Sequence, residues 1–253
     1  MNTCRFCHFT ITPTKLFAAL IIIFMMACTN GKINLKPYYY PLDELLKEGK
    51  VYEYKSDNLN MASSFWYYKT ILRNDTTYLV GQNISQLMEV EQKTVERKTG
   101  NGMVLHSNQI FLKDSTGKTN MYQVEVLEKS LFPFAVTDTN GIFLYKVKWH
   151  TDSLRHTTII RNRRFIGFTE MTFDAKPIKC AKFELKELIE DFKDGYIEYP
   201  FHGVEYYGEN IGLIKYVKII REGMQLSFTL NKIYTVTEFE KKYRTKLENP
   251  VIH

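Results

Sequence analysis

Cys28 is the residue whose position points most clearly to chemistry, because a cysteine thiol can be alkylated or acylated. It follows the apolar run 16–27 (LFAALIIIFMMA), and the small residue Ala27 comes immediately before it. The charged residues upstream are Arg5 and Lys15, both cationic. A bilayer-spanning helix needs about 20 apolar residues, so this run is too short to cross as a finished helix. The pattern predicts an export signal over residues 1–27 that is cut off in the mature protein.

Residues 25–28 (MMAC) resemble the lipobox of bacterial lipoproteins, in which Leu most often stands at the position of Met25. The resemblance implies that the Cys28 thiol receives a diacylglycerol group and becomes the new N-terminus, so that fatty acid such as palmitate anchors the chain in a membrane. An ordinary signal peptide and an N-terminal anchor helix are the alternatives. Surface lipoproteins of Bacteroidetes often carry Asp or Glu after this cysteine. Residues 29–32 (TNGK) lack them, which favours the periplasmic side of the outer membrane.

The other cysteines predict neither a disulfide nor a cofactor. Cys4, Cys7 and His8 match the C-x-x-C-H spacing of covalent haem attachment, but they precede the export segment and would be discarded with it. With Cys28 acylated, Cys180 has no partner. It lies in a stretch with the composition of a strand, which predicts a small buried hydrophobic residue.

Two histidines are close enough in sequence to suggest a metal site. His150 and His156 flank a predicted hairpin turn that contains Asp152. Zinc takes three or four protein ligands, and the neighbouring Lys148 and Arg155 add positive charge. The sequence therefore predicts solvated histidines at a hairpin end and no metal.

The densest basic spot is Arg161, Arg163 and Arg164. Arginines in such a stretch usually occupy a solvated strand face, which is the interpretation we favour. Contact with lipid headgroups or with a protein partner is the alternative.

No recognisable catalytic motif occurs in the chain. Neither the G-x-S-x-G turn of a nucleophilic serine nor the G-x-x-x-x-G-K-[ST] phosphate loop is present. Residues 184–194 are rich in carboxylates, but lysines interrupt them and the 12-residue calcium loop pattern is absent. We expect no catalytic residues, no cofactor and no enzymatic activity.

Composition and charge limit the class of protein. Removing residues 1–27 leaves 226 of the 253 residues, and 44% of the chain is hydrophobic, which is enough for one folded domain. The net charge falls from +6 to +4 when Arg5 and Lys15 are removed, and the remaining charges of both signs are interleaved. This distribution argues against a nucleic-acid partner.

Short strands separated by turn residues dominate the mature chain. A short helix is predicted between Pro41 and Gly49, and from Lys50 onward ten to twelve strands alternate with turns such as Asn74-Asp75. The fold class is all-β, as a curved antiparallel sheet or half-open barrel. The expected organisation is a lipoprotein signal peptide over 1–27, a tether over 28–36 and a single β domain over 37–253. Residues 238–247 are predicted to be a frayed end, with a last half-turn of helix as the alternative.

Apolar and polar residues alternate most clearly in two of these strands. Phe143, Tyr145, Val147 and Trp149 share one face, as do Leu226, Phe228 and Leu230. This face is either a packed core or the lining of an apolar cavity, and alternation does not distinguish the two.

Two stretches resemble a group of uncharacterised secreted and lipid-anchored β proteins that is common in Bacteroidetes. They are residues 39–54, with YYPL followed by GKVYEY, and residues 206–215 (YYGENIGLIK); Tyr52 stands where the group usually has Trp. Such domains are similar to the half-barrels of the LolA and LolB lipoprotein carriers. The resemblance implies a concave sheet that holds an acyl chain, with a helix plugging it.

Together these observations predict a lipid-anchored binding module of the cell envelope. The membrane is the expected partner through the lipid, together with an apolar small molecule whose binding residues are unknown. The alternatives are an assembly lipoprotein that docks onto another envelope protein and, less favoured, an uncharacterised enzyme.

Overall fold

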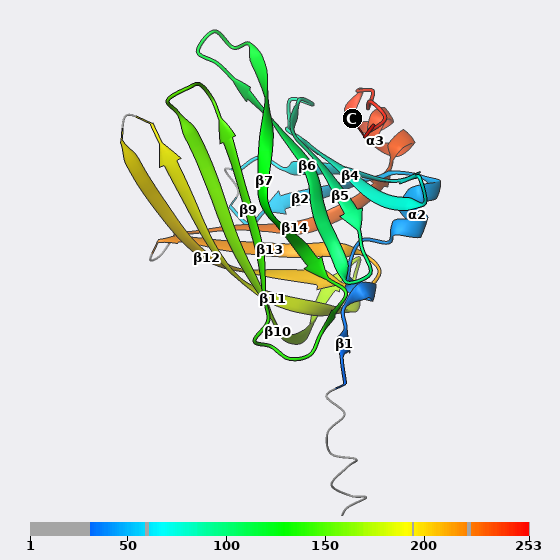
Figure 1. Cartoon of the computed structure of the whole chain (residues 1–253). Helices are drawn as coiled ribbons and strands as arrows, with labels where there is room; N and C mark the ends of the chain where they lie inside the picture. The colour runs from blue at the N-terminus through cyan, green and yellow to red at the C-terminus, as the bar shows by residue number, and fades with distance from the viewer. Residues whose placement is uncertain (1–30, 59–60, 194, 222–223, 253) are drawn as a thin grey trace, which may run out of the picture. The chain divides into compact units, whose positions relative to one another are not determined.

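Antiparallel strands make up most of the computed structural model, which describes residues 31–252 except 59–60, 194 and 222–223 (Figure 1). The predicted signal peptide of residues 1–27 and the predicted lipid site Cys28 lie outside the described residues. Residues Ile33–His253 form one compact unit.

Within the described residues, twelve strands close into a barrel in the order β10-β11-β12-β13-β14-β2-β3-β4-β5-β6-β7-β9, and β9 pairs with both β7 and β10. The prediction of an all-β fold on a curved antiparallel sheet is confirmed. The barrel strands are β2 (Lys50–Ser56), β3 (Ser64–Arg73), β4 (Thr76–Ile84), β5 (Val90–Lys98), β6 (Gly102–Lys113), β7 (Thr119–Pro133), β9 (Ile142–His150), β10 (His156–Phe173), β11 (Lys176–Phe192), β12 (Tyr196–Gly208), β13 (Gly212–Arg221) and β14 (Met224–Thr235).

Tight turns connect several of these strands. Asn74 and Asp75 between β3 and β4, and Asp174 and Ala175 between β10 and β11, all have positive φ values between 48° and 58°. Two consecutive residues of this kind make the hairpin turn whose twist matches the twist of the strands. Because strands alternate in direction, these turns share one end of the barrel. The β2–β3, β4–β5, β6–β7, β9–β10 and β11–β12 connections share the other, which we call the hairpin end.

The N-terminal segment is folded from Ile33 onward. β1 (Ile33–Asn34) pairs with β8 (Ala135–Val136), and Leu35 is fully buried. Residues 33–36, which the sequence pattern predicts as part of the tether, therefore belong to the domain. The burial of Leu35 and the pairing of β1 with β8 fix this segment in the domain, although its sequence lacks periodicity.

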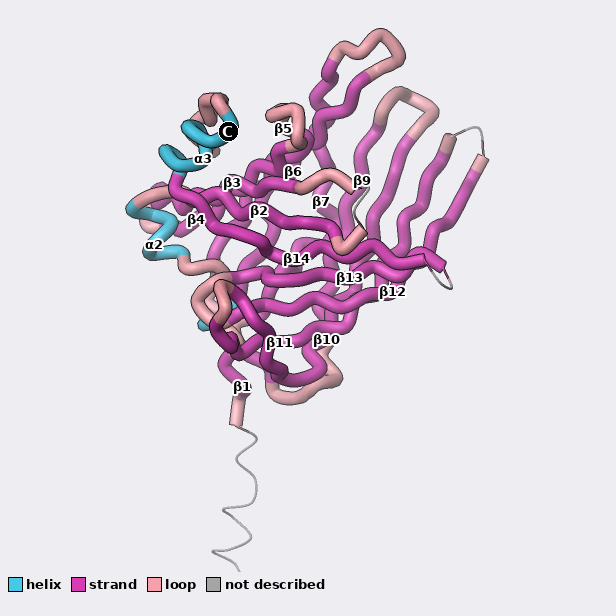
Figure 2. Tube along the Cα trace, turned by 180° about the vertical axis from the view of Figure 1, so that it is seen from behind, coloured by secondary structure: helices cyan, strands magenta, loops and turns pink. Residues whose placement is uncertain are grey.

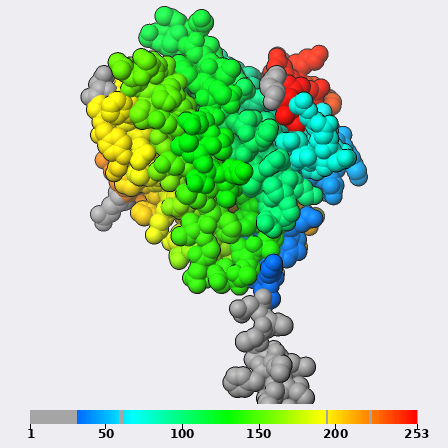
Figure 3. Space-filling view, viewed as in Figure 1, coloured from blue at the N-terminus to red at the C-terminus, as the bar shows by residue number. Residues whose placement is uncertain are grey.

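The two α-helices in the described part of the chain are short and lie outside the ring of strands (Figure 1). The predicted helix after Pro41 is present as α2 (Leu42–Lys47), preceded by the 3-10 turn η1 (Lys36–Tyr38). The predicted frayed C-terminus is wrong, because α3 (Val236–Tyr243) is a two-turn helix. Its capping box joins Thr235 and Glu238, and Phe239 is fully buried against β2 and β3. Figure 3 shows α3, in red, beside the cyan surface of β3.

β12 is a strand that the sequence pattern does not reveal. It contains Pro200 and Gly203, which normally argue against a central strand. In the barrel it pairs with β11 along its whole length and with β13 from His202 onward. Pro200 thus lies where β12 has a single neighbour, so its missing N–H costs the sheet less.

No helix among the described residues is long and apolar enough to cross a membrane.

Candidate ligand cavity inside the barrel

The barrel encloses a cavity of about 540 Å³. Small-molecule sites typically measure roughly 300–1,000 Å³, so this cavity is large enough for a ligand. Most of its wall is aromatic or aliphatic, and a minority is charged. The principal lining residues are Tyr39, Tyr40, Tyr54, Trp66, Tyr68, Leu105, Leu131, Phe132, Tyr145, Ile159, Leu185, Tyr207, Leu213, Tyr216, Leu226 and Phe228, together with Glu96, Arg161, Arg163, Glu205 and Lys218.

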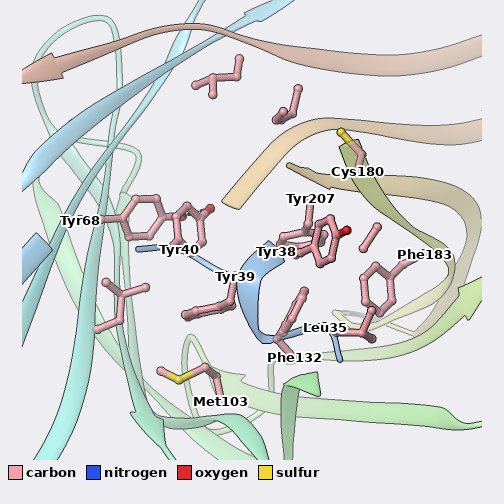
Figure 4. Packing of buried hydrophobic residues seen from close by; sticks show 14 of the residues in the cluster. Leu35, Tyr38, Tyr39, Tyr40, Tyr68, Met103, Phe132, Cys180, Phe183 and Tyr207 are labelled. Atoms are coloured by element: carbon pink, nitrogen blue, oxygen red, sulfur yellow. Dashed lines mark hydrogen bonds between the residues drawn. The ribbon is translucent and has the colours of Figure 1, made fainter. Parts of the chain in front are cut away.

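Tyrosines from the N-terminal segment close one end of this cavity. Tyr38, Tyr39 and Tyr40 are buried among the core rings (Figure 4). They follow β1, which lies at the end of the barrel opposite the hairpin end (Figure 2). The Tyr39 ring packs at 5.2 Å from Phe132, and the Tyr40 ring at 4.3 Å from Tyr68. We call residues 35–40 the plug.

The two stretches that carry the family resemblance meet at the plug. Gly212 lies directly under the Tyr40 ring, where a Cβ atom would collide with it. Asn210 donates its backbone N–H to the carbonyl of Pro37 (2.7 Å), and the Tyr54 hydroxyl donates to the carbonyl of Leu213 (2.9 Å). Residues about 160 positions apart in the chain thus form one closed end.

Stacked rings line the walls between the plug and the hairpin end. Trp66 and Tyr68 on β3 stack at 5.5 Å, and Tyr216 and Phe228 on β13 and β14 stack at 5.2 Å. The prediction that the alternating residues of 143–149 and 226–230 share an interior face is confirmed, because Tyr145, Leu226 and Phe228 line the cavity and Val147 and Leu230 are buried. The interior is partly packed and partly hollow.

Arg163 and Glu205 form a closed ion pair deep in the wall. Arg163 donates to both Glu205 oxygens, from Nε (2.6 Å) and Nη2 (3.1 Å), and its Nη1 donates to the carbonyl of Leu131 (2.6 Å). The two side chains are 9% and 7% exposed. Burial opposes ionisation of Glu205, but Arg163 outweighs it and lowers the pKa of the carboxyl.

Arg161 and Lys218 share a single carboxylate. Arg161 Nε donates to Glu187 Oε2 (2.7 Å), and Lys218 Nζ donates to the other oxygen of Glu187. Glu187 is 1% exposed, whereas the Arg161 and Lys218 side chains are 29% and 21% exposed and line the cavity. Burial opposes ionisation of Glu187, yet the two cations outweigh it and lower its pKa.

Glu96 is the carboxylate on the cavity wall whose ionisation is disfavoured. Burial raises its pKa from 4.5 to about 7, although the hydrogen bond from the Tyr39 hydroxyl and the charge of Arg163 oppose this shift. Its cross-strand neighbours are Leu79 and Leu105, which explains the poor solvation.

The structure corrects the interpretation of the basic cluster. Arg161 and Arg163 face the interior of the barrel, and only Arg164 lies on the outer face, exposed and paired with Glu184 (2.7 Å). A signal was present in the sequence, since Arg161 and Arg163 share the parity of Ile159 and Phe165 along β10.

The remaining predicted residues are placed as follows. His150 and His156 are cross-strand neighbours at the hairpin end, with ring centroids 5.4 Å apart. Asp152 accepts backbone hydrogen bonds from Leu154 (2.8 Å) and Arg155 (2.9 Å) within the turn. Among the described residues no three His, Cys, Asp or Glu side chains are grouped to hold a metal ion.

Cys180 is buried in the core, as the sequence predicts. Burial raises the pKa of its thiol to about 11, so the reactive thiolate is disfavoured.

Comparisons with known proteins find a similar fold in solved structures. No family model matches the chain, and no curated protein matches its sequence. A candidate lipoprotein from Parabacteroides distasonis superposes with a TM-score of 0.52 at 15% identity, covering 76% of this chain and 95% of its own. A candidate exported protein with a YmcC-like fold from Bacteroides fragilis gives 0.54 at 11% identity, covering 78% and 99%. At these identities the likeness shows the fold alone.

Fold and site together define the class: an antiparallel β barrel, plugged at one end, around a mostly aromatic cavity with a charged wall. Among proteins of known structure, it shares its fold with two that are candidates for export or lipid anchoring.

Proposed function

We propose that this chain is a lipid-anchored binding module of the bacterial cell envelope that holds a ligand with an apolar body, such as an acyl chain, in the barrel cavity. One observation carries the proposal: the cavity of about 540 Å³ is closed at one end by the plug and lined mainly by rings and aliphatic side chains. Apolar surface of this kind gains free energy when a hydrocarbon displaces water from it.

The anchor and the location belong to the same proposal. Acylation of Cys28 tethers the barrel to the outer membrane on its periplasmic side, where acyl chains are available. The likeness in fold to candidate lipoproteins and exported proteins supports this placement. The resemblance to the LolA and LolB carriers supports an interior that holds an acyl chain. In this proposal the protein binds without catalysing a reaction.

Trp66 offers a direct test, because it lines the cavity and the chain has only one other tryptophan, Trp149. In a Trp149→Phe variant, Trp66 becomes the single tryptophan. The full chain in lipid nanodiscs is titrated with a fatty acid that carries bromine atoms on its chain, since bromine quenches tryptophan at contact distance. We expect saturable quenching of Trp66.

The matched control is Trp66→Phe, in which the remaining Trp149 lies on the interior face of β9 nearer the hairpin end, beyond the residues that line the cavity. We expect weaker quenching in this variant. Equal, unsaturable quenching in both variants would show that the chain does not enter the cavity and would overturn the proposal.

Docking onto another envelope protein is a second candidate function, favoured by apolar side chains at the hairpin end. Leu154, Tyr196 and Met224 are exposed there, Leu154 to 75%. A photo-crosslinking residue at Leu154 in cells should capture one reproducible partner, while the same residue at Asp174, in a turn at the opposite end, should not. Identical patterns from both positions would contradict docking through this end.

A further inference from the structure

One part of the cavity wall, around Arg161 and Lys218, has more cations than carboxylates. Arg161 and Lys218 both bind Glu187, and among the described residues neither has another carboxylate partner. Two cations and one carboxylate leave an excess of one positive charge, and this excess faces the cavity because both cations line it. The two cationic side chains are only partly exposed, so water screens the excess charge in part and the arrangement favours an anion that completes it.

The neighbouring charges do not supply that anion. On the same strand, Arg163 donates to both oxygens of Glu205, which also accepts from the Tyr207 hydroxyl (3.3 Å). The charge of Glu205 acts on Arg161 as well, but Glu205 forms its ion pair with Arg163. Glu96 binds the Tyr39 hydroxyl, and the cation that acts on it is Arg163. The pair Arg163–Glu205 is therefore balanced, whereas the set Arg161, Glu187 and Lys218, which we call the cationic triad, is not.

Ring faces hold the two cations of the triad in position. The Arg161 guanidinium lies 5.7 Å from the centre of the Tyr145 ring, and Lys218 Nζ lies 4.6 Å from the centre of the Phe201 ring. Groups that are fixed before a ligand arrives lose little conformational entropy on binding it. The triad is thus preorganised for an acidic group.

Apolar side chains adjoin the triad on the same wall. Lys218 is the cross-strand partner of Leu226, and Ile159 lies two residues from Arg161 on β10. A ligand with its acidic group at the triad would therefore have its hydrocarbon part against aromatic and aliphatic lining.

We propose that the cavity ligand is an amphipathic anion, whose single acidic group, a carboxylate or a phosphate, binds Arg161 and Lys218 while its hydrocarbon body fills the aromatic part of the cavity. This inference rests on the proposed function and deepens it. Arginine and lysine both form charge-assisted hydrogen bonds with either acidic group.

The test compares three brominated probes of equal chain length on the Trp149→Phe background in nanodiscs: a fatty acid, an alkyl phosphate and the neutral fatty alcohol. We expect at least one of the acidic probes to bind about tenfold more tightly than the alcohol, the gain of one charge-assisted hydrogen bond. Preference for the carboxylate points to free fatty acids, and preference for the phosphate points to phosphorylated lipids.

Variants of the triad locate the acidic group. Lys218→Met and Arg161→Met each leave Glu187 with one cation, so each removes the excess charge without stranding a carboxylate. We expect either variant to lose about tenfold in affinity for the acidic probe and to keep its affinity for the alcohol. Arg164→Met removes the same charge from the outer face and should change neither affinity.

The outcomes separate this inference from the proposed function. If all three probes bind with equal affinity and the triad variants change nothing, the cavity holds apolar ligands and the acidic-group inference is wrong. If no probe quenches Trp66 above the Trp66→Phe control, both the proposed function and the inference fail.

Discussion

Arg161 and Arg163 are two residues apart on β10, point to the same side of the sheet and have different electrostatic partners. Arg163 is matched one to one with Glu205, and Arg161 shares Glu187 with Lys218. A buried ion pair in which each charge has its own partner stabilises the barrel wall. Two cations that share one carboxylate keep hydrogen-bonding capacity for the acidic group of a ligand.

The balanced pair predicts a large effect on stability. Arg163→Met leaves Glu205 buried without its cation, and breaking such a pair typically costs about 3–5 kcal/mol. We expect a loss of this size in the free energy of unfolding, measured by urea denaturation. The double variant Arg163→Met/Glu205→Gln should recover most of the loss, because no unpaired charge is left, and Arg164→Met should change stability little. If the double variant fails to recover the lost stability, the cost of Arg163→Met comes from lost packing and not from the unpaired charge of Glu205.

Glu96 predicts a pH dependence of stability. Its pKa is raised from 4.5 to about 7, so the folded protein holds a proton that the unfolded chain releases between these values. Stability from this group is fully present below pH 4.5 and is lost as the pH rises towards 7, by roughly 1–3 kcal/mol. Glu96→Gln keeps an acceptor for Tyr39 and cannot ionise, so we expect this fall to disappear in urea titrations across pH 4.5–8. Glu125→Gln, at an exposed position, is the control, and an unchanged fall in Glu96→Gln would contradict the assignment.

At the scale of elements, the plug closes one end of the barrel. Residues 35–40 have no regular periodicity, but Leu35 and three tyrosines are buried among rings from β3, β7 and β12. The β12–β13 turn supports the plug through Asn210 and Gly212. The two ends of the domain sequence are therefore mutually dependent.

Gly212 tests that dependence. Its φ is +97°, and a Cβ would collide with the Tyr40 ring, so Gly212→Ala combines backbone strain with displacement of the plug. Gly117→Ala provides the matched control, since Gly117 has φ +84° with open space around it. We expect Gly117→Ala to cost about 1 kcal/mol and Gly212→Ala to cost about 1–3 kcal/mol more in unfolding free energy. Equal losses would show that Tyr40 yields freely and that the plug is loosely held.

At the scale of the whole molecule, the proposed function joins a cavity to a membrane anchor. Cys28→Ala removes the thiol that the lipobox resemblance assigns to acylation. We expect the variant to incorporate no labelled palmitate in cells and to leave the membrane fraction, while the barrel keeps its quenching response to brominated fatty acid. Palmitate incorporation into the variant, or unlabelled wild-type protein, would contradict lipidation at Cys28.

The sequence by itself determined the all-β class, the positions of most strands and which residues of a strand share a face. These features are local: alternation with a period of two and residues such as Asn74 and Asp75 act over a few positions. The same local signals failed at β12, where Pro200 and Gly203 obscure a strand, and at α3, whose buried face depends on β2 and β3.

Only the tertiary structure decided which interior-facing residues of different strands meet, and with them the site. Arg163 meets Glu205 across 42 residues and Tyr54 meets Leu213 across 159, so these pairings depend on the register of strands around the closed barrel. Register is a property of the whole sheet, and a shift by one residue would turn Arg161 and Arg163 outward to solvent. Closure of the barrel therefore made part of a cavity wall from residues that, read along the chain, resemble an ordinary basic surface.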